Sequence, residues 1–295
     1  MAHITDEEIK SLEQKAYEIR KSIVEMLVEA GSGHTAGPLG MADIFTAMYF
    51  RVLKHDPHWP EWEARDRLVL SNGHICPVHY ATLAHAGYFP VGELKTLRKF
   101  GTRLQGHPHR GSLPGIETTS GPLGSGLSQA VGMTIGFKMD HKPNQVYGLM
   151  SDGEQECGQT WEAAMLAGKL RLANLTAIID RNNIQIDGMT EDIMPLEPLR
   201  AKYEAFNWHV LEINGHDFEE IVNATEEARA IYEKPVLIIA HTIPGKGVPE
   251  IEFDYRWHGV PPGKGPEDVI PAKDQKKVFL ERLRTMGGRI TSEHQ

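Results

Sequence analysis

The chain has 295 residues, of which 40% are hydrophobic, and a formal net charge of −9. This length and composition allow a sizeable core and suggest one large or two small domains. The negative balance argues against a nucleic-acid-binding surface, because such surfaces are basic. No run reaches 18 apolar residues, so no membrane span is expected.

The cysteines and the amino terminus bear on cellular location. The first eight residues are acidic and lack the apolar core of a signal peptide. Cys76 and Cys157 form neither a disulfide framework nor a metal-binding spacing. A cytoplasmic protein is therefore the default expectation.

In chain order, the predicted elements begin with two helices. Thr5 can cap a helix over 6–30, in which apolar residues recur every three or four positions and which Gly31 ends. A second helix fits 41–53. Predicted strands and helices then alternate. The strands are 67–70, 145–150, 175–180, 210–214 and 236–241, and the helices are 79–86, 126–139, 159–170, 199–206, 218–232 and 274–287.

This alternation predicts an α/β fold, a doubly wound parallel sheet with helices on both faces. No repeat, low-complexity segment or long linker interrupts it, so we expect a single domain over 1–295. The amino-terminal helix over 6–30 and a helical tail over 274–295 flank its centre. Ligands of such sheets bind at the carboxyl ends of the strands.

Polar residues follow two neighbouring predicted strands. Asp152-Gly153 follows one strand, and Asn182 follows the next, thirty positions later, with a helix between them. A strand–helix–strand unit of this kind places both polar tips at the same edge of a parallel sheet. Each pair alone is also ordinary turn chemistry. Together, a carboxylate and an amide oxygen suit Mg²⁺ or Ca²⁺ and predict a metal-bridged diphosphate clamp.

Four glycine-containing segments support a ligand site, since glycine lets the backbone approach a ligand closely. A single histidine in such a loop would be structural or solvated, but three Gly-His pairs in one chain are harder to dismiss. A zinc site is the competing interpretation of His107 and His109, although no cysteine or spaced histidine lies nearby. The segments are Ser32-Gly33-His34, Ser71-Asn72-Gly73-His74, Gly106-His107-Pro108-His109 and the run from Gly121 to Gly126.

These motifs, in order, resemble the N-terminal diphosphate-binding domain of transketolase over roughly 13–262. The family pattern is Gly-Asp-Gly, about thirty residues and then Asn; here Ser151 replaces the first glycine. The resemblance implies a thiamine-diphosphate-binding fold and transfer of a two-carbon ketol unit from a ketose phosphate to an aldose phosphate. Its remaining motifs are Trp161-Glu162-Ala163, the run from Asn182 to Gly188, and Trp257-His258-Gly259.

The resemblance also implies roles for individual residues. Asp152, Asn182 and the backbone carbonyl of Ile184 would hold Mg²⁺ or Ca²⁺. Leu123 and Ile186 would pack against the cofactor rings. The cofactor-binding set would be His74, Gly121, Leu123, Asp152, Gly153, Asn182, Ile186 and His258. The catalytic set would be His34, His74, His107 and His258, histidines suited to proton transfer near neutral pH.

Two further positions concern the interface between active sites. Glu162 matches a family glutamate that is buried at the dimer interface. Cys157 stands where the family usually has a second glutamate, so the carboxylate network between sites is in doubt. Buried like charges titrate as a set, and losing one should weaken coupling more than chemistry.

In the family, a second, pyrimidine-binding domain supplies the glutamate that activates the cofactor and most ligands of the sugar phosphate. Only 33 residues follow Pro262 in the 295-residue chain, too few for another domain. We therefore expect the N-terminal subunit of a split transketolase, which is active only with a C-terminal subunit in a heterotetramer of two of each. Pentose phosphates, and hence the pentose phosphate pathway of carbohydrate metabolism, are the default substrates.

Three alternatives stay open. The chain could belong to another thiamine-diphosphate enzyme, either deoxyxylulose-phosphate synthase-like or the α subunit of a 2-oxo acid dehydrogenase. It could be a non-catalytic homologue that binds cofactor, or a truncation of a longer chain. The set of His34, His107 and His258 favours a sugar substrate and an active enzyme.

Overall fold

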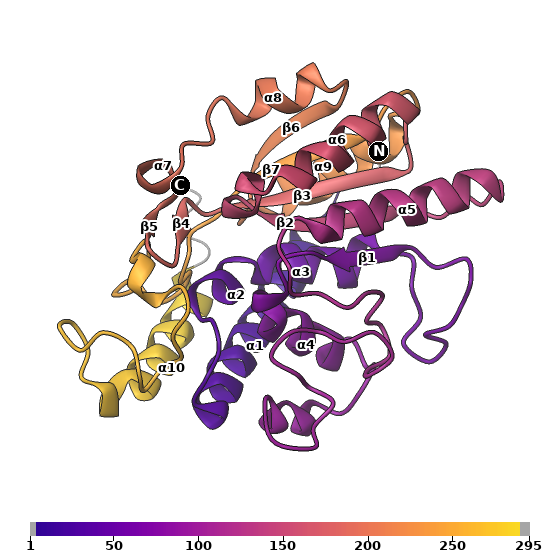
Figure 1. Cartoon of the computed structure of the whole chain (residues 1–295). Helices are drawn as coiled ribbons and strands as arrows, with labels where there is room; N and C mark the ends of the chain where they lie inside the picture. Colours follow the sequence, from indigo (N-terminus) through magenta and orange to yellow (C-terminus); the bar gives the residue numbers. More distant parts are fainter. Residues whose placement is uncertain (1–3, 290–295) are drawn as a thin grey trace.

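The computed structural model describes residues 4–289 (Figure 1). Its centre is a five-stranded sheet in the order β1-β2-β3-β7-β6. All neighbouring strands in this sheet run parallel, so their carboxyl ends share one edge. The predicted fold class is confirmed. The strands are β1 (Arg67–Leu70), β2 (Val146–Ser151), β3 (Leu175–Arg181), β6 (His209–Asn214) and β7 (Val236–His241).

Helices cover both faces of the sheet, which explains why its strands are almost continuously apolar. Leu149 and Ile178 point into one core, and Met150 and Ile179 into the other. The first core is covered by α1 (Asp6–Ala30), α3 (Ala42–Ala47), α4 (Cys76–His85), α9 (Phe218–Ala230) and α10 (Ala272–Arg289). The second is covered by α5 (Ser125–Met139), α6 (Gly158–Leu170) and α8 (Leu199–Ala205).

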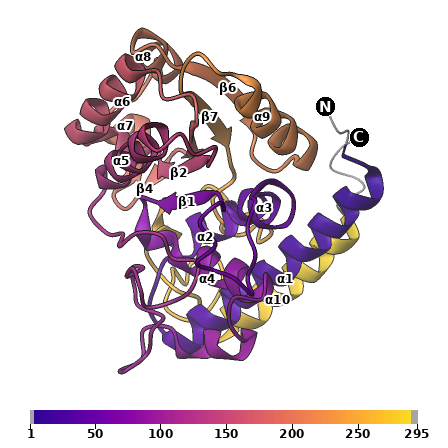
Figure 2. The same cartoon turned by 90° about the vertical axis from the view of Figure 1, so that its right-hand side faces the viewer.

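The predicted helix over 6–30 is confirmed as α1. Thr5 and Glu8 form a reciprocal capping box at its start, and Gly31 ends it with a φ of 57°. Its apolar face, which includes Leu12, Ile19 and Ile23, is buried. The helix lies alongside α10, as Figures 1 and 2 both show.

The predicted helix over 41–53 is confirmed as a helical stretch over 42–52, in which α3 continues directly into a π-helical turn over Met48–Val52. The short helix before it, α2 (Ala36–Gly40), was not predicted. Almost every residue here is buried, so no polar face marks the change of helix type. The other predicted bounds agree within three residues, and 290–295 of the predicted tail lie outside the described residues.

Three short elements beside the carboxyl edge of the sheet were not predicted. They are β4 (Ile184–Gln185) and β5 (Gly188–Met189), which form an antiparallel hairpin, and α7 (Thr190–Ile193). Elements of two to four residues leave no readable periodicity in a sequence. Among the described helices, none has both the length and the apolar character needed to cross a bilayer.

Candidate functional site at the carboxyl edge of the sheet

Three adjacent strands end in predicted site segments at one edge of the sheet. Ser71 follows β1, Asp152 follows β2 and Asn182 follows β3. The Ser71 amide donates to Leu149 O at 2.8 Å, and the Asp152 amide donates to Asp180 O at 3.1 Å. The strand register therefore brings together the segments that the sequence analysis singled out.

A buried carboxylate ties these segments to the glycine-rich start of α5. Glu154 is completely buried and accepts hydrogen bonds from Ser71 Oγ and from the backbone N–H groups of Gly124 and Ser151. Ser71 Oγ in turn accepts from the Gly126 N–H at 2.9 Å. Burial raises the pKa of Glu154, and these donors oppose the rise. One side chain thus joins its own loop after β2 to the loop after β1 and to the start of α5, a role that the sequence motif did not indicate.

The Asp152–Asn182 pair is ordered by the backbone around it. Asp152 Oδ1 accepts from the Gly153 N–H, and Oδ2 accepts from the Asn183 N–H, both at 2.7 Å. Asn182 donates through Nδ2 to Asp180 Oδ2 at 2.8 Å, while its Oδ1 accepts from the Ile184 N–H at 3.0 Å. Both side chains are buried, and the amide orientation is set by this network.

These residues fit a divalent cation with hard oxygen ligands. Burial raises the pKa of Asp152, and burial together with the nearby Asp152 raises the pKa of Asp180 to about 7. Arg181 lies 3.3 Å from Asp152, and a bound cation would compensate the remaining buried carboxyl charge at this edge. Within residues 4–289, no group of three or more His, Cys, Asp or Glu side chains has a metal-binding arrangement, at His107 and His109 or elsewhere.

Asn72 provides a further sign of a ligand. This residue of the Ser-Asn-Gly-His motif is completely buried, yet neither Nδ2 nor Oδ1 has a hydrogen-bond partner among the described residues. Buried amides normally satisfy both groups. Sequence reasoning noted the motif but assigned no role to Asn72.

Three of the predicted catalytic histidines form a compact cluster. The ring centroid of His34 lies 4.7 Å from that of His74 and 5.4 Å from that of His258. The rings of His74 and His258 are also 5.4 Å apart. The Nδ1 atoms of His34 and His258 are buried and have no partner among the described residues. The segment before α2, the segment after β1 and the segment before α10 therefore each contribute one histidine to the same cluster.

Close packing positions the His34 segment. Gly33 has a φ of 129°, and a Cβ at this position would lie 2.6 Å from Leu27 Cδ2, so only glycine fits. Thr35 Oγ1 donates to Val260 O at 2.6 Å and ties this segment to the one that carries His258.

Burial dominates the electrostatics of the cluster in the chain by itself. The sequence predicts histidines suited to proton transfer near neutral pH, and this stays a prediction for the chain with its cofactor. Burial, followed by the nearby His258, lowers the pKa of His34 to about 3, and burial lowers the pKa of His258 to about 4. Burial and the neighbouring imidazoles place the pKa of His74 well below its usual value. All three rings are therefore neutral at physiological pH in the chain by itself.

His107 lies at the rim of this cluster rather than within it. His107 is exposed. Its ring lies beside Gly121, where an added Cβ atom would be 3.9 Å from the ring. Burial of part of the ring and the charge of Arg98 lower its pKa. Cys76 Sγ donates to Gly106 O at 3.2 Å and helps to hold the His107 loop.

The predicted ring-packing and interface residues are exposed in this chain. Leu123 is 37% exposed and Ile186, in the turn between β4 and β5, is 64% exposed, so both leave apolar surface at the site. Glu162 is also exposed, on the same face of α6 as Met165 and Leu166. Cys157 is partly buried at the start of α6.

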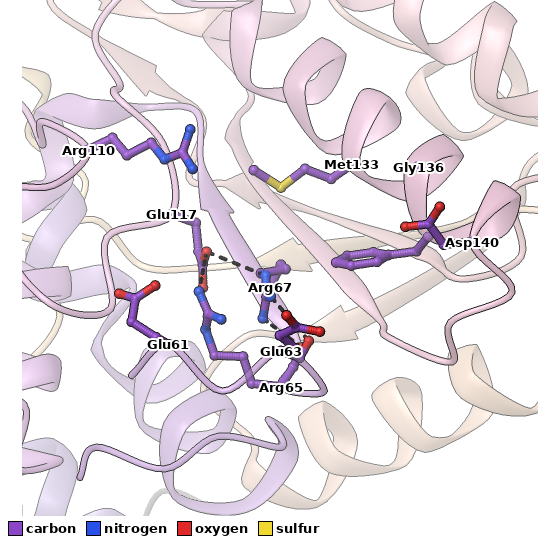
Figure 3. Close-up of a pocket in the computed structure, with 10 residues that line it drawn as sticks. Glu61, Glu63, Arg65, Arg67, Arg110, Glu117, Met133, Gly136 and Asp140 are labelled. Atoms are coloured by element: carbon purple, nitrogen blue, oxygen red, sulfur yellow. Dashed lines mark hydrogen bonds and ion pairs between the residues drawn. The ribbon is translucent and has the colours of Figure 1, made fainter. Parts of the chain in front are cut away.

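A hollow of about 570 Å³ lies at the opposite end of β1 (Figure 3). There Arg65 donates through Nε and Nη2 to the two Glu117 carboxylate oxygens at 3.0 and 2.9 Å, and Arg67 lies 3.6 Å from the same carboxylate. Burial raises the pKa of Glu117, and the two arginines oppose the rise. This cluster anchors the loop whose Ser120 donates to Leu70 O at 2.5 Å, next to the site.

A doubly wound parallel sheet with an oxygen-donor clamp and glycine-rich loops at its carboxyl edge defines a class of diphosphate-binding α/β proteins. The family model for the transketolase thiamine diphosphate binding domain matches residues 12–277, and the chain belongs to this family.

Two relatives have nearly the length of this chain. The 6-deoxy-6-sulfo-D-fructose transketolase subunit SqwG of Clostridium sp. strain MSTE9 is 49% identical over 236 residues, which cover 80% of this chain and 86% of that protein. An apulose-4-phosphate transketolase subunit of Phocaeicola vulgatus is 40% identical over 276 residues, which cover 93% of this chain and 98% of that protein.

The solved structures that match are longer. Transketolase from Campylobacter jejuni has a TM-score of 0.81 and 34% identity, and the match covers 96% of this chain but 47% of that one. Transketolase from Leishmania mexicana has the same TM-score and 33% identity, with 96% and 45% covered. The chain thus spans less than half the length of these transketolases. The predicted thiamine-diphosphate-binding fold and transketolase class of enzyme are confirmed.

Proposed function

We propose that this chain is the N-terminal subunit of a two-component transketolase, which transfers a two-carbon ketol unit from a ketose phosphate to an aldose phosphate. The observation that carries the proposal is the cluster of neutral histidines, His34, His74 and His258, at the same sheet edge as the Asp152–Asn182 pair. The two relatives of similar length, which are named as transketolase subunits, support it.

We assign the clamp to the cofactor and its metal. Asp152, Asn182 and the Ile184 carbonyl would hold Mg²⁺ or Ca²⁺, and the metal would hold the diphosphate. His74, Gly121, Gly153 and His258 would contact the cofactor, and the exposed Leu123 and Ile186 would pack against its rings. When bound, thiamine diphosphate supplies the electron sink for breaking a carbon–carbon bond of the ketose.

The histidines would then act mainly through hydrogen bonds to sugar hydroxyls. A neutral imidazole has one donor and one acceptor, and the Nδ1 atoms of His34 and His258, which have no partner within residues 4–289, are available for this purpose. A bound diphosphate anion next to His74 and His258 would favour their charged forms and raise their pKa values toward the range for proton transfer. The cofactor would therefore tune the proton donors that the substrate meets.

The exposed surface of α5 and α6 supports a second copy of the chain as a partner. The exposed face of α5 carries the small residues Ser128, Gly132 and Gly136, which would let a neighbouring helix approach closely. A copy packed against this surface would bury Glu162 and give two of each subunit. The apolar residues exposed there are Leu123, Met139, Met165, Leu166 and Leu170.

The names of the two relatives suggest a class of substrate. Their names specify 6-deoxy-6-sulfo-D-fructose in one case and apulose-4-phosphate in the other. We therefore propose a ketose donor with a terminal anionic group, with a pentose phosphate as the default. The assignments to the pentose phosphate pathway and to the cytoplasm stay predictions.

The test is reconstitution of the purified full chain with the polypeptide that co-purifies with it. We expect no ketol transfer by the chain alone and transfer from a ketose phosphate once the second polypeptide is added. Vigorous turnover by the partner-free chain would contradict the two-component proposal. Consumption of pyruvate in place of ketose phosphate would favour the synthase-like or dehydrogenase-like alternative.

A further inference from the structure

Arg181 directly precedes Asn182 of the clamp and contacts the Asp152 carboxylate, which is proposed to bind the metal. It is the last residue of β3, follows Asp180 and precedes Asn182, and is only 3% exposed. Its Nη1 donates to Asp152 Oδ2 at 3.3 Å. The same oxygen also accepts from the Asn183 N–H at 2.7 Å, so two donors from the β3 end fix its position.

The other arm of the guanidinium reaches a segment beyond the β4–β5 hairpin. Arg181 Nη2 donates to Glu191 Oε1 at 2.7 Å and to Glu197 Oε1 at 3.1 Å. Glu191 also accepts from the Leu196 N–H at 3.2 Å, which closes the segment 190–197 around the guanidinium. A single planar, permanently charged group thus joins Asp152 to two other carboxylates.

We propose that Arg181 is a positioning residue that holds the Asp152 carboxylate ready for a divalent cation and braces it against the segment 190–197. The part that concerns the cation rests on the proposed function; the part that concerns Asp152 rests on the contacts alone. A buried carboxylate with fewer donors would rotate toward other partners, and this rotation would remove an oxygen from the clamp.

A cation beside a metal site could also weaken metal binding by repulsion. Charge counting argues against this for Arg181, because its one positive charge faces two glutamates in addition to Asp152. Arg181, Glu191 and Glu197 together carry a charge of −1 when the glutamates are ionised. Orientation of Asp152, rather than repulsion of the metal, is therefore the larger effect, and loss of Arg181 should weaken metal binding.

The first test uses hydrogen–deuterium exchange on the metal-free full chain. Arg181→Gln should speed exchange of the Gly153 and Asn183 amides, which donate to Asp152, and of the Leu196 amide, which donates to Glu191. Arg181→Lys keeps the charge but cannot bridge three carboxylates, so an intermediate effect is expected. Unchanged exchange at Gly153 and Asn183 in Arg181→Gln would overturn the proposal, whether or not the metal assignment stands.

A matched control is available on α8. Arg200 also joins two glutamates, Glu212 at 2.6 Å and Glu204 at 3.1 Å, but it is exposed and lies outside the clamp. Arg200→Gln should leave exchange at Gly153 and Asn183 as in the wild type. Accelerated exchange at those amides in this variant would show a general loosening of the fold and would also overturn the proposal.

The second test measures Mn²⁺ binding to the full chain in the presence of thiamine diphosphate. Arg181→Gln should raise the Kd for Mn²⁺ about 10- to 100-fold, the usual effect of losing a group that orients a metal ligand. Arg181→Lys should recover part of the loss. Unchanged or tighter binding in Arg181→Gln would overturn the role of Arg181 toward the cation. Equal binding by wild type and Asp152→Asn would instead refute the metal site of the proposed function, and the exchange result would still decide the role toward Asp152.

Discussion

The two ends of β1 show two uses of buried polar groups. At the amino end, the Glu117 carboxylate is paired with both Arg65 and Arg67 (Figure 3). At the carboxyl end, Asn72 and two histidine nitrogens are buried without partners in the described part of the chain. The first arrangement is complete by itself, whereas the second needs something from outside.

Whether buried polar groups are paired distinguishes a structural cluster from a ligand site, independently of the size of the cavity. Unpaired buried polar groups cost free energy, about 1–3 kcal/mol for each lost partner, so several of them at one sheet edge favour a ligand there. A carboxylate that is already paired with two arginines offers no such gain. On this basis we propose the carboxyl edge as the functional site and a structural role for the Glu117 cluster.

The largest effect should come from Asp152. Asp152→Ala removes the carboxylate of the clamp, and metal-dependent thiamine diphosphate binding by the assembled enzyme should weaken at least about 100-fold. Calorimetry measures this directly. The matched variant at the other end, Glu117→Gln, should change the Kd little. Equal affinities for wild type and Asp152→Ala would refute the metal assignment.

The next effect should come from His34. His34→Asn leaves the clamp intact but removes an imidazole proposed to bind the sugar, so kcat/KM should fall about 100-fold. Steady-state kinetics of the reconstituted enzyme gives this value, with calorimetry to confirm that cofactor affinity is kept. His109→Ala, an exposed histidine outside the cluster, is the control. A loss of the same size in both variants would argue against a specific role for His34.

The amino-end cluster should show its effect in stability. Glu117→Gln leaves Arg65 and Arg67 without their carboxylate in a largely buried setting, which should lower the free energy of unfolding by about 2 kcal/mol. Urea titration measures it. Turnover at saturating cofactor should stay close to that of the wild type. A variant of native stability that has lost catalysis would reverse the roles of the two ends.

A smaller effect concerns pH. The pKa of His258 is lowered to about 4 in the folded chain, so between about pH 6.5 and 4 the unfolded chain binds more protons there. The contribution of His258 to the free energy of unfolding is therefore fully present above pH 6.5 and is lost as the pH falls toward 4. Asp180, whose folded pKa is raised to about 7, has the opposite sign, so the comparison must be differential.

The differential measurement compares wild type with His258→Asn in urea titrations from pH 7 to pH 4.5. The stability of the wild type relative to the variant should decrease by about 1 kcal/mol per pH unit as pH falls below 6.5. A difference that is constant across this range would mean that His258 is not held neutral by the fold.

The smallest effect should come from Cys157. Cys157→Glu restores the carboxylate that the family usually has at this position, and turnover should remain within about twofold, because coupling between sites rather than chemistry depends on it. Initial-rate assays of the reconstituted enzyme test this. A large loss of activity would show that the residue takes part in the site itself.

Much of this molecule could be predicted from the sequence because the informative signals are periodic or local. The strands over 67–70 and 236–241 match β1 and β7 at both ends, since short apolar runs bounded by polar turns mark them. Asp152 and Asn182 were placed at one edge because strand–helix–strand connections have a fixed geometry.

The remaining features depend on contacts between distant segments. The role of Glu154 arises from Ser71, 83 positions away, and nothing near Glu154 in the sequence indicates it. In the sequence, Arg181 is indistinguishable from an ordinary charged residue within the motif. In the structure its side chain is buried and contacts Asp152. The lowered pKa values of His34 and His258 likewise follow from burial, which a sequence does not show.

The most direct measurement is a crystal structure of the full chain grown with Mn²⁺ and thiamine diphosphate, with anomalous scattering used to locate the metal. The account predicts an anomalous peak in contact with Asp152, Asn182 and the Ile184 carbonyl, with the diphosphate at the same edge and the hollow around Glu117 empty. A metal bound among Glu61, Glu63 and Glu117, with none at Asp152, would contradict it.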